Sequence, residues 1–130
     1  MMGNRVIVLF IASLVAANLV AHHAVNSDDI DYSTRISLEG KIANIEWINP
    51  HVIIHIEVLS EFGVKQLWLV EAATPNTLLR SGLNRNSLSL MSSVSFEAYP
   101  SIINPCTVTC LSYGISITTA SGRTSPLGDL

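Results

Sequence analysis

The sequence has little charge, few aromatic residues and only two cysteines. Seven lysine and arginine residues stand against ten aspartate and glutamate residues, which gives a net charge of −3 at pH 7. Proteins that bind nucleic acid need a surplus of basic side chains to neutralise phosphates, so we expect no nucleic-acid partner. The same deficit argues against an electrostatic membrane anchor. An aromatic content of 6% is also low for a surface that stacks bases.

Catalytic motifs are missing as well. The chain contains no P-loop, no G-x-G-x-x-G fingerprint and no G-x-S-x-G nucleophile motif. Its glutamates are not spaced as an evident acid/base pair. The sequence therefore does not point to an enzyme, and a small hydrolase is only a remote alternative.

The longest apolar run lies at the N-terminus. A short segment that carries Arg5 precedes Val6–Val15, which is apolar except for Ser13, and small residues such as Ala17 and Ala21 follow. This order is typical of a secretory signal peptide, and the run is shorter than the roughly 20 residues of a membrane span. An uncleaved anchor helix is the alternative. We predict a signal peptide over 1–21, cleavage after Ala17 or Ala21, a periplasmic or secreted product, and no membrane partner after processing.

The rest of the chain alternates in the manner of β-strands. Val52, Ile54, Ile56 and Val58 fall on one face of a strand, which predicts that this face is buried. Thr74-Pro75 is typical of a helix start, with a hydroxyl cap before a proline in the first turn. The expected strands run from about residue 35 to 47, 51 to 59, 64 to 71, 94 to 99, and from 106 or 108 to 119, with a short helix over 75–81.

This order of elements predicts a mainly β fold, an OB-like five-stranded barrel with one short helix between the third and fourth strands. Closing the barrel would remove exposed strand edges from a small and apolar chain. We expect a polar arm over 22–34, where neighbouring aspartates repel one another, the barrel over 35–120, and a flexible tail over 121–130.

The two cysteines, Cys106 and Cys110, are four positions apart. On a straight strand this spacing is about 13 Å, which is beyond the reach of a disulfide. A bond between them therefore requires that the chain turn back on itself between them. Export would permit a disulfide. Two free buried thiols, or a two-thiolate metal site that lacks its other ligands, are the alternatives.

Three stretches carry a resemblance to a known family. They are the histidine pair after Ala21, the segment 40–51 (GKIANIEWINPH), and the segment 74–82 (TPNTLLRSG) with Asn-Ser-Leu behind it. Together with Glu71, they resemble an uncharacterised family of small exported bacterial proteins, domain of unknown function 6152. The resemblance covers roughly residues 21–99 and implies an exported barrel-like domain. It brings no established activity, and the segment 91–93 and the C-terminal third depart from the family pattern.

Histidines are the main candidates for a binding site. An N-terminal His22 would offer its α-amine and a ring nitrogen, and imidazole nitrogen suits copper and zinc. His51 opens the second expected strand and Glu71 ends the third, so we expect these two to lie close together. We name His22, His23, His51 and Glu71 as candidate ligands of copper or zinc. In the other interpretation, His51 fixes the turn after Asn-Pro by bonding to backbone carbonyls.

The register between the second and third expected strands determines which side chain lies opposite His55. A four-residue turn over 60–63 would place His55 opposite Trp68, where the ring packs against an aromatic side chain. The same register would place His51 opposite Ala72. A shift of one residue would exchange the faces of the strand.

Taken together, these patterns predict an exported, non-catalytic binding or accessory module. Its expected partner is a small ligand, a metal ion or a protein surface, and it should need no cofactor to fold. A periplasmic copper- or zinc-binding protein that uses the N-terminal histidines is the alternative. The ligand and the oligomeric state do not follow from the sequence.

Overall fold

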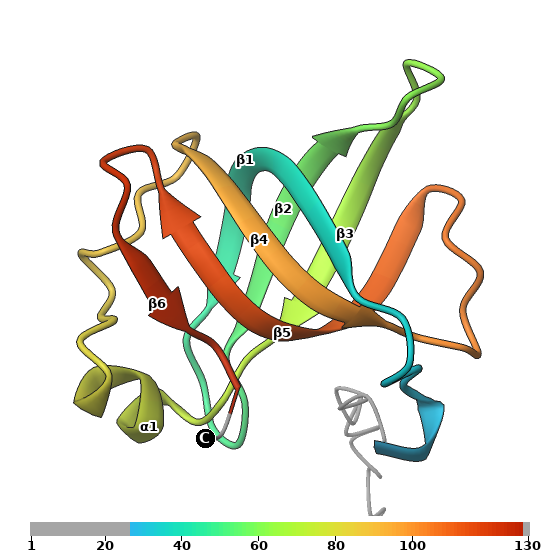
Figure 1. Cartoon of the computed structure of the whole chain (residues 1–130). Helices are drawn as coiled ribbons and strands as arrows, with labels where there is room; N and C mark the ends of the chain where they lie inside the picture. The colour runs from blue at the N-terminus through green and yellow to red at the C-terminus, as the bar shows by residue number, and fades with distance from the viewer. Residues whose placement is uncertain (1–26, 129–130) are drawn as a thin grey trace, which may run out of the picture.

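The computed structural model describes residues 27–128 (Figure 1). The predicted signal peptide over 1–21 lies outside this range, and so do His22 and His23. The described elements are η1 (Ser27–Asp29), β1 (Ile36–Glu46), β2 (Ile53–Leu59), β3 (Lys65–Glu71), α1 (Pro75–Arg80), β4 (Ser93–Pro100), β5 (Thr109–Thr119) and β6 (Thr124–Pro126). In the part of the chain that the structure describes, no helix is both long and apolar enough to cross a membrane.

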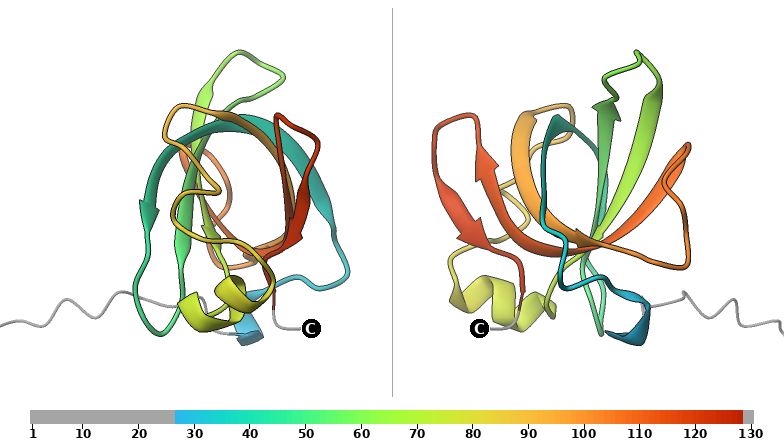
Figure 2. Two further views of the ribbon diagram at one scale, coloured as in Figure 1. Left: turned by 90° about the vertical axis from the view of Figure 1, so that its left-hand side faces the viewer. Right: turned by 45° about the vertical axis from the view of Figure 1, so that its right-hand side comes forward.

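Five of the strands close into a barrel. The sheet has the order β3-β2-β1-β4-β5-β6, and an additional parallel pairing between β3 and β5 joins its ends. The ring is visible end-on in Figure 2. The cyclic order β1-β2-β3-β5-β4, with one helix between β3 and β4, is that of an OB-like barrel. The predicted fold class is therefore confirmed.

Strand β1 is shared between the two halves of the barrel. Its first half, up to Lys41, pairs with β4, and its second half, from Lys41, pairs with β2. Gly40 lies next to this change of partner, and a Cβ atom there would stand 2.4 Å from the carbonyl oxygen of Glu57. A side chain would therefore push β1 away from β2. The arch of β1 in Figure 1 passes through this region.

The core fills the barrel with the side chains that alternation predicts. Ile54, Ile56 and Val58 of β2 are buried, and so are Trp68 and Val70 of β3. The burial of apolar side chains such as these is the main stabilising contribution to a domain of this size.

The helix closes one end of the barrel, close to the predicted bounds of 75–81. The Thr74 hydroxyl accepts a hydrogen bond from the Thr77 N–H at 3.2 Å, as an N-cap does. Leu78 of the helix is buried, and Gly82 follows the helix with φ of +87°, a conformation that favours glycine.

The C-terminal segment differs from the flexible tail that we expected over 121–130. Its described part forms β6 against β5, and Leu127 is fully buried. A Cβ atom at Gly114 would lie 2.8 Å from Leu127 Cδ1, so the glycine leaves the space that the leucine occupies. The glycine and proline residues of this segment predicted a flexible tail. This prediction was wrong because one buried side chain, Leu127, anchors the segment to the barrel.

The described part of the polar arm, from Ser27 onward, is attached to the barrel in spite of its aspartates. Ile30 forms a β-bridge with Ser101, and the Tyr32 ring meets Tyr99 edge-on at 5.2 Å. Asp31 accepts hydrogen bonds from the hydroxyls of Ser33 and Thr34, which lower the pKa of this carboxyl. The repulsion that we expected among the aspartates is thus offset by local bonds.

Candidate functional site

Two of the predicted site residues meet at the helix-capped end of the barrel. His51 lies in the loop between β1 and β2, directly after the cis Asn49–Pro50 bond, and Glu71 ends β3. The Nδ1 atom of His51 lies 2.5 Å from Oε1 of Glu71. Backbone bonds between Val52 and the segment after Glu71 hold the two chains together there.

The two partners differ in their exposure to solvent. The side chain of Glu71 is 3% exposed and that of His51 is 33% exposed. His51 Nδ1 is itself buried, and its contact with Glu71 is close without the alignment of an ordinary hydrogen bond.

His55 does not pack against Trp68, and this part of the prediction was wrong. The loop between β2 and β3 leaves Leu59 paired with Lys65, so His55 pairs with Leu69. Trp68 points into the barrel, and its ring lies 6.2 Å from that of Phe96. The turn holds one residue more than we assumed, and one residue of register exchanges the faces of a strand.

On the outer face, His55 forms a second histidine–glutamate pair. Its Nε2 lies 2.7 Å from Oε1 of Glu46, and both side chains are partly buried. Nε2 is thus engaged with a carboxylate, whereas in the His51 pair the contact falls on Nδ1. The two pairs therefore use different ring nitrogens.

The outer surface of β2, β3 and β5 is largely apolar, which the sequence reasoning missed. Strand pairing aligns His55 with Leu69 and Leu111, and the next row holds Glu71. We call this surface the outer apolar face; its members are all partly exposed, and they are Ile53, Leu67, Leu69, Leu111 and Tyr113. The available signal was the unbroken apolar run in β3, residues 67–70, because a strand with one solvated face alternates instead.

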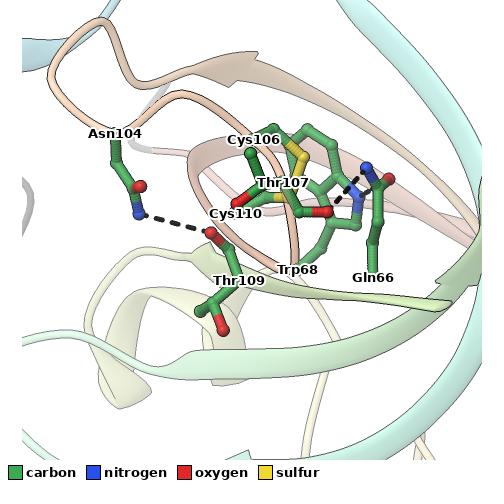
Figure 3. The surroundings of a disulfide bond; sticks show 7 residues. All are labelled: Gln66, Trp68, Asn104, Cys106, Thr107, Thr109 and Cys110. Carbon is green, nitrogen blue, oxygen red and sulfur yellow. Dashed lines mark hydrogen bonds between the residues drawn. A yellow bond between two sulfur atoms is a disulfide. The ribbon is translucent and has the colours of Figure 1, made fainter. Parts of the chain in front are cut away.

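The loop between β4 and β5 borders this face and contains a disulfide (Figure 3). Cys106 and Cys110 are bonded with their Cα atoms 4.6 Å apart. Cys106 precedes β5, so the chain turns back between the two residues, as the spacing required. Both sulfur atoms are used in the bond, which excludes the free-thiol and thiolate-ligand alternatives. Gln66 also donates to the Thr107 carbonyl at 3.4 Å and ties the loop to β3.

A cleft lies over the arch of β1. This cleft has a volume of about 590 Å³, and Gly40 lies in its lining. Its charges are mixed: Glu39 and Glu57 lie with Lys41 and Lys65, and Lys65 forms an ion pair with Glu57 at 2.9 Å. Such a lining does not select a ligand of one charge.

Within residues 27–128, no three His, Cys, Asp or Glu side chains lie close enough together to hold a metal ion. His51 and Glu71 are therefore only part of the predicted ligand set.

The family comparison covers most of this architecture. A model of a family of unknown function, DUF6152, matches residues 10–105 of the chain. The chain belongs to this family. A search of curated proteins found no match. The motif residues Trp47, His51 and Glu71 lie within the matched range. His51 contacts Glu71, and Arg85, from the segment after α1, donates a hydrogen bond to the Trp47 carbonyl at 3.2 Å.

Proposed function

We propose that this DUF6152 protein is an exported, non-catalytic binding module whose outer apolar face receives an extended apolar segment of a partner protein. The observation that carries the proposal is the set of five partly exposed apolar side chains on the solvent side of β2, β3 and β5. Contiguous apolar surface of this kind marks interaction sites in soluble proteins.

The surroundings of the face support this assignment. OB-like barrels bind their ligands across strands β2 and β3, between the β1–β2 and β4–β5 loops. Here those loops add further exposed apolar side chains, Ile48 at 44%, Ile102 at 61% and Ile103 at 62% exposure. The deficit of basic residues disfavours the nucleic-acid ligands that some OB folds bind. An apolar polypeptide segment fits the surface better.

Export is supported by two features of the chain. The N-terminal sequence has the charged, apolar and small-residue order of a signal peptide. The disulfide between Cys106 and Cys110 suits an oxidising compartment. The proposed location is therefore the periplasm or the extracellular medium.

The face can be tested with a short soluble peptide that alternates valine with threonine. We expect it to shift backbone amide NMR signals of β2, β3 and β5, and Leu69→Asp to abolish these shifts. Phe62→Asp is the matched control, because Phe62 is a large apolar residue, 92% exposed, at the tip of the β2–β3 hairpin and away from the face. Circular dichroism would check that both variants fold. Equal binding by both variants, or shifts confined to the cleft over β1, would contradict the proposal.

A further inference from the structure

The first half of β1 pairs along one edge only. From Ile36 to Lys41 it pairs with β4, and β2 pairs with the opposite edge from Lys41 onward. Within residues 27–128, no strand pairs with that opposite edge before Lys41. A strand edge without a neighbour presents a row of N–H and C=O groups that can pair with another chain. We call residues 35–39 on this side the β1 edge.

The hydrogen bonds to β4 show which backbone groups belong to the β1 edge. The Ile42 N–H donates to the Ser92 carbonyl at 3.1 Å, on the β4 side. The bonds between antiparallel strands fall on alternate residues, and the register with β4 is unbroken over residues 36–41. Ser37 and Glu39 therefore direct their N–H and C=O groups away from β4, toward the open side.

The inward-facing side chains of this half of β1 are incompletely covered. Ile36 and Leu38 pack against the core, yet both are partly exposed. Their partners on β4, Ala98 and Phe96, are buried. A strand added along the β1 edge would remove more of the apolar surface of Ile36 and Leu38 from water, which is favourable.

We propose that the β1 edge pairs with the same edge of a second copy of the chain, antiparallel and about a two-fold axis at Ser37. In this register Ser37 faces its own copy, Ile36 faces Leu38 of the second copy, and Arg35 faces Glu39 of the second copy. Opposite charges that face each other across two strands are stabilising. The two-fold axis repeats each contact, so the edge is complementary to itself.

The charges select this register over its neighbours. An axis at Leu38 would place Arg35 opposite Lys41, which is also positive and already pairs with β2. An axis at Glu39 would place two carboxylates opposite each other, which is destabilising. Arg35 is exposed, with its guanidinium 6.0 Å from the centre of the Tyr99 ring, so it lies at the surface beside the edge. The β1 edge is separate from the outer apolar face, which contains no residue of β1.

Sedimentation equilibrium of protein purified after export tests the pairing. We expect a monomer–dimer equilibrium with a dissociation constant below about 100 μM. Arg35→Glu and Glu39→Arg should each weaken the dimer by roughly tenfold, and the double variant should restore it, because opposite charges face each other again. Glu61→Arg is the matched control, since it makes the same change of charge at an exposed position in the β2–β3 turn. Leu69→Asp should leave the dimer unchanged, which separates this edge from the outer apolar face.

Ser37→Pro tests the backbone directly. Proline removes an N–H that points to the open side and takes no bond from the β4 ladder, and edge strands tolerate proline. The variant should fold, as circular dichroism would show, and remain monomeric. Protein that is monomeric up to about 1 mM would overturn the proposal and leave the edge to a strand of another protein. A dimer that persists equally in Ser37→Pro and both charge variants, or one that is lost in Leu69→Asp instead, would also overturn it.

Discussion

Breaking the bond between Cys106 and Cys110 should destabilise the barrel by about 2 kcal/mol. Cys106→Ser is the cleanest perturbation, because Cys106 is exposed and Cys110 is fully buried. Serine at the exposed position removes the bond and leaves the buried sulfur in the core. The change therefore tests the covalent link without creating a cavity.

The magnitude follows from the size of the closed loop. The two cysteines are four positions apart, so the bond closes a loop of five residues. The loop-closure entropy of the unfolded chain for this length corresponds to about 2 kcal/mol at 25 °C. For a domain of about 100 residues, a loss of this size lowers the midpoint of thermal unfolding by roughly 10 °C.

Thermal unfolding followed by circular dichroism gives the measurement, with and without a reductant. The wild-type protein in reductant should unfold at the midpoint of Cys106→Ser, and the variant should not respond to reductant. Trp68, which pairs with Cys110, offers fluorescence as a second probe. Equal midpoints for the oxidised wild-type protein and the variant would refute the reasoning, and so would a variant that is still sensitive to reductant.

Three further changes test other parts of the fold. Leu127→Ala should cost about 2–5 kcal/mol in urea unfolding, because the side chain is fully buried; a change below about 1 kcal/mol would mean that the tail contributes little. Thr74→Ala should cost about 1 kcal/mol through loss of the helix cap, and Thr74→Ser, which keeps the hydroxyl, should restore most of it. The pKa of Asp31 is lowered from 3.8, so its contribution to stability is present above that value and is lost as the pH falls through the lower folded pKa. An NMR titration of its carboxyl should give a midpoint below 3.8, and a midpoint at or above 3.8 would contradict the hydrogen bonds that the carboxyl accepts from Ser33 and Thr34.

Much of the fold could be predicted because local patterns and tertiary packing agree. The alternation of Val52, Ile54 and Ile56 predicted a half-buried strand, and each of these side chains is fully buried. Thr74 and Gly82 predicted the ends of the helix, because a cap and a positive φ are local requirements. These features could be predicted because each depends on the conformation preferred by a few neighbouring residues.

The remaining features depend on contacts that the local sequence does not specify. The register between β2 and β3 depends on one residue in the turn, and so the partner of His55 was assigned wrongly. The burial of Leu127 depends on the space that Gly114 leaves on another strand. The proximity of His51 and Glu71 could be predicted because both flank the same pair of strands, whereas the difference in their burial could not.

The shared pairing of β1 has a consequence for how the chain folds. We expect its second half to pair with β2 early in folding, since only a short loop separates them, and β3 to follow through a hairpin. Its first half must wait for β4, and the ring closes only when β5 reaches β3. Closure over such sequence separations is slow, typically milliseconds to seconds. We expect a three-stranded meander to form early, with its apolar surfaces open to solvent until the last strands arrive.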